Sequence, residues 1–356
     1  MKSQFLTRRV ARSRSFPRPL VLLSLSALAI HVASADTFRW SGGSSTDPTD
    51  FNDPDNWTFY LGGTPGSGDE AFFQVDATAN LYSDTTVGRV ELSTKYASVR
   101  EVTVDTNGNT LTLDLITSAT ANAGTGSATL NLKGNVVFAA SQPSIQAGTT
   151  GRVVFDSGTL TSTGGSSLPF YGGGVVELKS TAVGSGIGSV NISGGTELNI
   201  TGTSSIAGNL RLEGGTSLAL GGTDTLDLTG DIYTISASST AADWVIDLAG
   251  TSPNTSLINA VDIDITNIDL DLSNVPSYTA TDVPYVLATY TGTLTGDEFA
   301  SISGLGGHQI VYNFGPSSNQ IAIIPEIGHA TPLLGGLLPL LMVRSRRRRG
   351  PAVGAK

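Results

Sequence analysis

The chain has 356 residues, among them 43 glycines and no cysteine, and only 14% of its residues are charged, against about 25% in a typical protein. The absence of cysteine excludes disulfides, thiolate metal sites, iron–sulfur clusters and cysteine nucleophiles. The net charge of −10 averages two basic ends and an acidic middle: residues 36–324 hold 29 acidic and eight basic side chains, and residues 1–19 and 344–356 hold six basic residues each. The acidic middle would repel nucleic acid, so we expect no nucleic-acid partner.

Residues 1–35 are typical of a secretory signal peptide. A basic stretch precedes an apolar run at 20–30, which is too short for a lasting membrane span. The small residues Ala33 and Ala35 form an A-x-A cleavage site directly before Asp36. We therefore expect export and cleavage by signal peptidase after Ala35; the alternative is an uncleaved membrane anchor.

Residues 36–85 form an N-terminal module that contains two tryptophans, Trp40 and Trp57. Large aromatic side chains can cover the open end of a repeat protein, which would otherwise expose its core to water. We therefore predict that this module is a cap. The alternative is that the two indole rings stack on a sugar.

An acidic loop lies within this module. Asp47, Asp50, Asp53 and Asp55 lie close together in a turn-forming stretch of the sequence, and carboxylate oxygens are ligands that Ca²⁺ prefers. The spacing matches neither an EF-hand nor a calcium roll. The loop is therefore a candidate calcium site, with a hydrated acidic loop as the alternative, and no other metal or cofactor is expected.

Residues 86–279 consist of short stretches in which apolar and polar side chains alternate, as they do in β-strands. Clusters of Gly, Ser, Asn and Thr, which form turns, bound these stretches. The motif Gly-Gly-Thr-x-Leu-x-(Ile/Leu) occurs at 194–200 and again at 214–220, and a related copy follows at 221–228. A repeat of about 20 residues suits one turn of a solenoid.

We predict an all-β fold with a right-handed parallel β-helix as its body; a β-sandwich is the alternative. The strand spacing is variable, and we expect almost no aromatic core residues between 118 and 231. Both features favour the β-helix.

Carboxylates are the plentiful reactive groups of this body. Asp262 and Asp264 form one pair on a strand face and Asp269 and Asp271 another, each about 7 Å apart, a separation that suits acid–base cleavage of sugars. The residue between the two aspartates of each pair is apolar and is expected to face the core. The aspartates would then lie on the opposite, solvated face of the strand, which is the alternative to a catalytic pair. His308 is the one histidine of the body, at a turn that enters a strand, which does not suit a Ser-His-Asp triad. We predict that the protein is not an enzyme.

Residues 280–324 are rich in aromatic strand segments, at 285–294 and 308–312, and end with a strand at 319–323. We predict that they cap the C-terminal end of the solenoid. Helices are expected only in the signal peptide and in the C-terminal tail.

Residues 325–349 combine three features in a fixed order. Pro325, Glu326 and Ile327 come first, and the mostly apolar residues 330–343 follow. The positive-inside rule would keep the arginines that come next on the cytoplasmic side, with the body outside the membrane. This segment is therefore a candidate membrane anchor, although its prolines and glycines weaken a spanning helix. The basic stop consists of Arg344, Arg346, Arg347, Arg348 and Arg349, and residues 350–356 form a short tail.

The C-terminal pattern resembles the PEP-CTERM sorting signal of exported proteins in Gram-negative bacteria. The resemblance implies that a membrane-embedded exosortase recognises Pro325 and Glu326 and processes the chain; Ile327 departs from the pattern, which has a second proline there. The module around Trp40 and Trp57 looks like one that often opens such proteins. The motifs at 194–200 and 214–220 resemble autotransporter-associated β-strand repeats, which implies a β-helical body without a specific partner. The alternative for the tail is an ordinary C-terminal anchor.

Together these features predict an exported structural or interaction protein of the cell envelope or extracellular matrix. It would be anchored in the membrane or sorted to the cell surface through its tail. The alternative is a β-helix that binds or degrades an extracellular polysaccharide. A third hypothesis is an adhesin for a protein partner.

Overall fold

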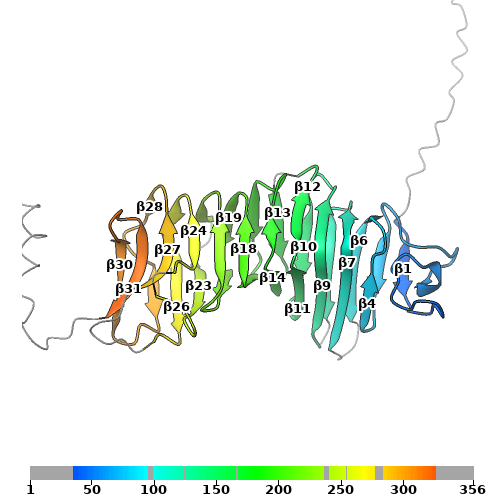
Figure 1. Cartoon of the computed structure of the whole chain (residues 1–356), viewed down its shortest axis with the longest axis horizontal. Helices are drawn as coiled ribbons and strands as arrows, with labels where there is room; N and C mark the ends of the chain where they lie inside the picture. Colours follow the sequence, from blue (N-terminus) through cyan, green and yellow to red (C-terminus); the bar gives the residue numbers. More distant parts are fainter. Residues whose placement is uncertain are drawn as a thin grey trace, which may run out of the picture. The chain divides into compact units, whose positions relative to one another are not determined.

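Parallel strands stacked in successive turns dominate the computed structural model, which describes residues 35–94, 99–123, 126–165, 167–235, 240–253, 255–276 and 284–325. The strands form a right-handed parallel β-solenoid (Figure 1). This confirms the predicted β-helix and rules out the β-sandwich.

Each turn contributes strands to three parallel ladders, which we call faces A, B and C. Face A consists of β1 (Thr37–Trp40), β3 (Glu70–Phe73), β6 (Arg89–Thr94), β8 (Thr117–Ala123), β10 (Ser144–Ala147), β13 (Ser167–Tyr171), β16 (Ser189–Ile192), β19 (Asn209–Glu213), β22 (Ile232–Ile235), β25 (Ile263–Asp264) and β28 (Leu294–Thr295).

Faces B and C share the two long strands β7 (Arg100–Leu113) and β9 (Ala128–Phe138), whose first halves belong to face B and whose second halves belong to face C. Face B also contains β4 (Ala77–Asn80), β11 (Gly151–Asp156), β14 (Val175–Lys179), β17 (Glu197–Thr201), β20 (Ser217–Leu220), β23 (Ala242–Asp247), β26 (Ile268–Ser273) and β29 (Ser301–Ser303). Face C also contains β5 (Thr85–Val87), β12 (Thr159–Ser162), β15 (Ala182–Val183), β18 (Thr203–Ile206), β21 (Thr225–Leu228), β24 (Ile258–Ala260) and β27 (Tyr285–Tyr290).

The repeat seen in the sequence is one turn of this solenoid. β17 pairs with β20, so that Leu198 of the first copy lies opposite Leu218 of the second. The copy at 221–228 belongs to a different face, because β21 pairs with β18. Other turns are longer, such as the one that brings Asp269 opposite Asp243 on face B. The turns therefore vary in length while the strands keep the register of their inward side chains.

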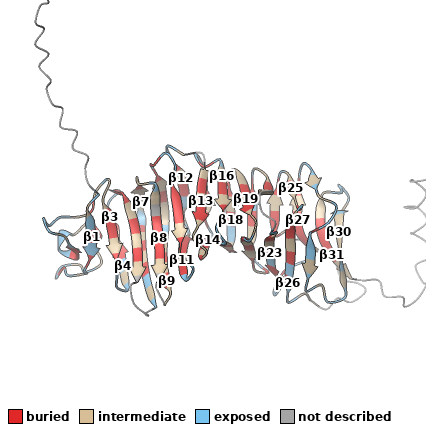
Figure 2. Cartoon of the chain, turned by 180° about the vertical axis from the view of Figure 1, so that it is seen from behind, coloured by how far each residue is buried: buried red, intermediate tan, exposed pale blue. Residues whose placement is uncertain are grey.

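One continuous apolar core fills the inside of the turns, and Figure 2 shows its buried residues along the strands. Alternation directs every second side chain inward, and each fully buried Leu or Val stabilises the fold by about 1.5–3 kcal/mol. Three buried phenylalanines lie in the middle of this core, where we expected almost no aromatic residue. One inward column of face B contains Leu130, Val153, Val176, Leu198, Leu218, Trp244 and Leu270, and the three phenylalanines are Phe138, Phe155 and Phe170.

Antiparallel pairing among the described strands occurs at the two ends of the solenoid. At the N-terminal end β2 (Trp57–Thr58) pairs with β1. At the C-terminal end β31 (Gln320–Pro325) pairs with both β27 and β30 (His308–Phe314). Caps at both ends are thus confirmed, although β27, β28 and β29 within the predicted C-terminal group still continue the parallel ladders.

A short 3₁₀ helix, η1 (Pro54–Asn56), corrects the expectation that helices would occur only in the signal peptide and the tail. Pro54 at its start has the backbone angle that a helix needs. The Asp53 side chain accepts a hydrogen bond from the Asp55 N–H at 2.9 Å and caps the helix. A single turn of this kind forms from local hydrogen bonds alone and has no 3.6-residue apolar period to reveal it.

Candidate functional site

The predicted processing residues lie at the limits of the described chain. Ala35 and Asp36 directly precede β1, whereas Ala33 lies outside the described residues. At the other end Pro325 ends β31 opposite His308. Glu326, Ile327 and the arginines at 344 and 346–349 lie outside the described residues, as does the apolar segment 330–343. No helix among the described residues is long and apolar enough to cross a membrane.

The acidic loop uses its carboxylates to form turns. Asp47 Oδ1 accepts hydrogen bonds from the backbone N–H and the hydroxyl of Thr49, at 2.9 and 2.7 Å, and these bonds lower the pKa of Asp47. Asp50 accepts from the backbone N–H of Asn52 at 2.8 Å. In the part of the chain that the structure describes, no group of three or more His, Asp or Glu side chains is placed to hold a metal ion. The hydrogen bonds of Asp47 and Asp50 are those of a turn-forming loop.

The same loop covers the free edge of the first turn. The Phe51 N–H donates to the Asn80 carbonyl at 2.9 Å, and the Asn80 N–H donates to the Thr49 carbonyl at 2.7 Å. The side-chain amide of Asn52 donates to the hydroxyl of Thr85 on β5 at 2.9 Å. Because an open strand edge is a template for unwanted pairing, this loop blocks further strands from adding to β4.

The two tryptophans of the N-terminal module are buried, with 7% of Trp40 and 5% of Trp57 exposed. Their ring centroids lie 4.9 Å apart at 81°, and both rings also contact Phe73. The indole N–H of Trp57 donates to the Phe51 carbonyl at 2.7 Å. The two rings pack inside the N-terminal end of the core, as expected of a cap, and their burial leaves neither ring face open for stacking on a sugar.

The aspartate pairs lie on outward positions, as the alternation predicts. Leu270, between Asp269 and Asp271, is buried, and the Ser301 hydroxyl donates to Asp269 at 2.6 Å. Asp243 lies directly opposite Asp269 on face B. Burial, and then the charges of Asp269 and Asp271, raise the pKa of Asp243.

The pair Asp262 and Asp264, like His308, makes local contacts. Asp262 accepts from the backbone N–H of Thr293 at 2.6 Å, and Asp264 from that of Thr266 at 2.9 Å. His308 begins β30, with its Nδ1 2.7 Å from the Leu305 carbonyl oxygen. These side chains therefore hold turns and strand neighbours together.

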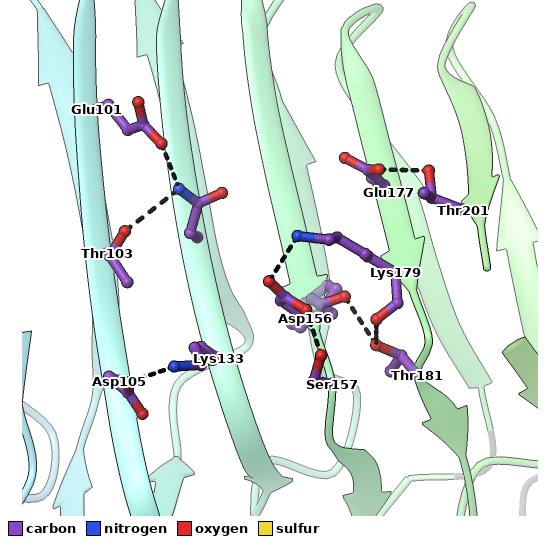
Figure 3. A network of polar contacts seen from close by, with 12 residues as sticks. Glu101, Thr103, Asp105, Lys133, Asp156, Ser157, Glu177, Lys179, Thr181 and Thr201 are labelled. Carbon is purple, nitrogen blue, oxygen red and sulfur yellow. Dashed lines mark hydrogen bonds and ion pairs between the residues drawn. The ribbon is translucent and has the colours of Figure 1, made fainter. Parts of the chain in front are cut away.

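A ladder of charged side chains runs along the outside of face B, and the sequence did not reveal it (Figure 3). Asp105, Lys133, Asp156 and Lys179 occupy the same register position on β7, β9, β11 and β14. The charges alternate in sign, with Lys133 Nζ 2.7 Å from Asp105 and Lys179 Nζ 2.9 Å from Asp156. Each lysine hydrogen-bonds its aspartate, which raises the pKa of both lysines.

A second group of contacts lies beside this ladder. Arg152 donates to Glu177 Oε2 from Nε at 3.1 Å and from Nη2 at 2.5 Å. The Thr201 hydroxyl donates to the other oxygen of Glu177 at 2.5 Å. Glu177, of which 7% is exposed, thus joins β11, β14 and β17 across three turns.

Two carboxylates share one arginine on face A. Arg89 Nη2 lies 2.8 Å from Glu70 Oε1 and 3.2 Å from Glu91 Oε2. Burial, and then the neighbouring Glu70 carboxylate, raise the pKa of Glu91 to about 7. Burial alone would raise the pKa of Glu70, but hydrogen bonds with Glu91, Thr37 and Arg89 lower it overall. Two carboxyls with separated pKa values can hold one proton near neutral pH.

Comparison with known proteins identifies no relative. No family model matches the chain, and neither a curated protein nor a solved structure matches it. The function is therefore inferred from the residues of this chain alone.

Proposed function

We propose that the protein is an exported structural or interaction protein of the cell envelope or extracellular matrix. The ladder on face B is the observation that supports this best. Asp105, Lys133, Asp156 and Lys179 satisfy one another across successive turns, so the outer charges join neighbouring turns instead of converging on a substrate. A solenoid that is apolar inside and cross-linked outside suits a stiff spacer or scaffold.

The proposed attachment is through the C-terminal segment. Pro325 is the last residue of β31, so the segment with Glu326, Ile327 and the arginine cluster follows the cap directly in the sequence. An exosortase-type enzyme would read Pro325 and Glu326 there, and signal peptidase would act at Ala35. The body would then lie outside the cytoplasmic membrane, either anchored or released at the cell surface.

Removal of residues 326–356 tests this proposal. The truncated protein is expected in the medium, whereas the full-length chain is expected in the envelope fraction. Intact mass of the native protein would report cleavage at both ends, and Pro325→Ala with Glu326→Ala is expected to block processing at the second. Equal envelope retention of the full-length and truncated chains would overturn the attachment.

A second candidate function is binding of an extracellular polysaccharide. One observation favours it: a groove of about 730 Å³ at the corner between faces C and A, next to outward polar side chains of face A. The measurement is retardation of the protein in gels that contain a polysaccharide. Release of reducing ends from the same polysaccharide would distinguish degradation from binding.

A further inference from the structure

We propose that Arg211, Asn191 and Tyr233 on face A bind a carboxylated sugar unit of a polysaccharide that lies in the adjacent groove. The proposal deepens the polysaccharide-binding function given above and rests on it. It assigns both a place on the solenoid and a chemical class of ligand.

Arg211 differs from most cations of the body in its partners. Within the described residues, no carboxylate lies at ion-pair distance from Arg211, and its guanidinium lies over the Tyr233 ring at 5.6 Å from the centroid. Arg39 is similar, because it lies over the Phe72 ring at 5.8 Å. The described cations that do pair with a carboxylate are Arg89, Arg100, Lys133, Arg152 and Lys179. Among the described residues this half-buried guanidinium has no carboxylate partner, so it offers a local positive charge to an external anionic group although the body as a whole is acidic.

Two buried polar atoms at this place have no hydrogen-bond partner among the described residues: Arg211 Nε and Asn191 Oδ1. The two residues lie directly opposite each other on β19 and β16, and Tyr233 lies opposite Arg211 on β22. Buried polar groups without a partner cost free energy and are uncommon. The two atoms lie on neighbouring strands, which points to a function for this part of face A. We call Asn191, Arg211 and Tyr233 the row.

The groove lies directly beside this row. Pro169 lines it and lies opposite Asn191, and Ser167 lines it and accepts a hydrogen bond from the Asn191 amide at 2.6 Å. The strands that carry these residues, β13, β16 and β19, are consecutive in face A and lie side by side (Figure 2). The groove and the row thus form one continuous surface.

Glycine corners keep the groove open. Gly186 has a φ of +83°, and a Cβ there would lie 1.7 Å from the Ser162 carbonyl oxygen. Close stacking of the turns therefore requires glycine at this corner, and no side chain fills the space. A volume of about 730 Å³ lies within the range of pockets that hold small ligands, and it suits a short stretch of sugar units.

The chemistry of the row selects the ligand. A guanidinium binds a carboxylate through two parallel hydrogen bonds, and the Tyr233 ring beneath it restricts its orientation. Asn191 Oδ1 is buried and has no hydrogen-bond partner among the described residues, so a rotation of the side chain would let it accept from a sugar hydroxyl. Ser141 and Gln142 on the groove wall add further polar groups. A uronic acid unit within a polysaccharide presents the carboxylate and the hydroxyls together.

The test compares binding to polygalacturonate and to neutral dextran by retardation in gels that contain each polymer. We expect the protein to bind polygalacturonate and not dextran. Arg211→Gln is expected to weaken binding at least tenfold, because it removes a charge-assisted hydrogen-bond donor. Ala207→Trp places a large ring in the groove from an exposed position and is expected to weaken binding without touching Arg211.

Arg39→Gln is the matched control, since Arg39 also lies on face A over an aromatic ring but far from the groove along the ladder. It is expected to bind as the unmodified protein does, and thermal unfolding would show that all three variants fold. If the protein binds polygalacturonate and Arg211→Gln and Ala207→Trp bind equally well, the site is wrong while polysaccharide binding stands. Equal binding to dextran would overturn recognition of a carboxylate, and binding to neither polymer would overturn both the site and the function.

Discussion

Lys133 and Asp105 lie far apart in the chain, yet the lysine Nζ donates to the aspartate at 2.7 Å because β7 and β9 place the two residues directly opposite each other. Asp156 lies opposite Lys133 on its other side. One lysine therefore lies between two carboxylates on adjacent turns. The alternation continues with Lys179 on β14.

Reversing the charge at Lys133 is expected to destabilise the solenoid. Lys133→Glu would place three consecutive carboxylates on one column of face B, and like charges on neighbouring strands repel. The midpoint of thermal unfolding is expected to fall below that of Lys133→Gln, which removes the charge alone. Because salt screens exposed charges, the difference between the variants should shrink at about 1 M NaCl; a difference that salt leaves unchanged would contradict the electrostatic cause.

Removing the Glu177 carboxylate is expected to lower the free energy of unfolding more than removing a less buried carboxylate does. Glu177→Ala leaves Arg152 and the Thr201 hydroxyl without their acceptor, so the free energy of unfolding should fall by about 2 kcal/mol. Glu197→Ala on the adjacent strand β17 is the control, with an expected change within about 0.5 kcal/mol. Urea unfolding of both variants measures the difference, and equal losses would show that the contacts of Glu177 contribute nothing specific.

Stability is expected to fall as pH rises from about 4.5 to 7, through Glu91. Its pKa is about 7 in the folded protein, against an ordinary value of 4.5, so in this window the folded state keeps a proton that the unfolded state has released. The stabilisation is complete below pH 4.5 and is lost above pH 7, on the order of 2 kcal/mol. Glu70, whose pKa is lowered, acts in the opposite sense. Its contribution to the free energy of unfolding is lost as the pH falls below the ordinary pKa of a glutamate.

Glu91→Gln isolates this effect, because the amide keeps the shape of the side chain and cannot ionise. Urea unfolding at pH 5 and pH 8 should show a smaller difference for the variant than for the unmodified protein, with the variant more stable at pH 8. A pH dependence that is the same in both proteins would show that Glu91 does not carry the shift.

Shortening one inward side chain is expected to disturb the stacked core. Leu218 is fully buried between Leu198 and Trp244 on the neighbouring turns, and Leu218→Ala should cost about 3 kcal/mol. Ser217→Ala, the outward neighbour on β20, should change the free energy of unfolding by less than about 0.5 kcal/mol. Similar costs for the two variants would contradict the assigned inward and outward faces.

Calcium is expected to leave stability unchanged. The carboxylates of Asp47, Asp50 and Asp53 already accept hydrogen bonds from their own loop. Thermal unfolding in millimolar CaCl₂ and in excess EDTA should give the same midpoint. A clear rise in the midpoint with CaCl₂ would restore the acidic loop as a calcium site.

Much of the fold could be predicted because alternation is a local property. In Thr225–Leu228 and in Asn209–Glu213 the leucines are buried and the polar residues face outward, as the order of residues indicates. The repeat at 194–200 and 214–220 likewise corresponds to one turn of the solenoid. The burial of Trp40 and Trp57 follows from the position of two large rings at the end of a repeat body.

The contacts between turns could not be predicted, because the turns differ in length. The turn that brings Leu218 opposite Leu198 is shorter than the one that brings Asp269 opposite Asp243, so no constant spacing identifies which polar side chains meet. Opposite charges at matching positions of successive strands indicate the ladder on face B, but only when the register between those strands is known. Without the alignment, Lys133 was only one of several scattered cations.

The amino-acid sequence by itself determined the all-β class, the division of each strand into an inward and an outward side, and the basic ends that predict export and attachment. These depend on residue type and on neighbours a few positions away. Only the tertiary structure decided that Asp105 and Lys133 pair, that the acidic loop covers the edge of β4, and that Arg211 lies over the Tyr233 ring beside a groove. Such relationships depend on register between turns, which is set by the packing of the whole core.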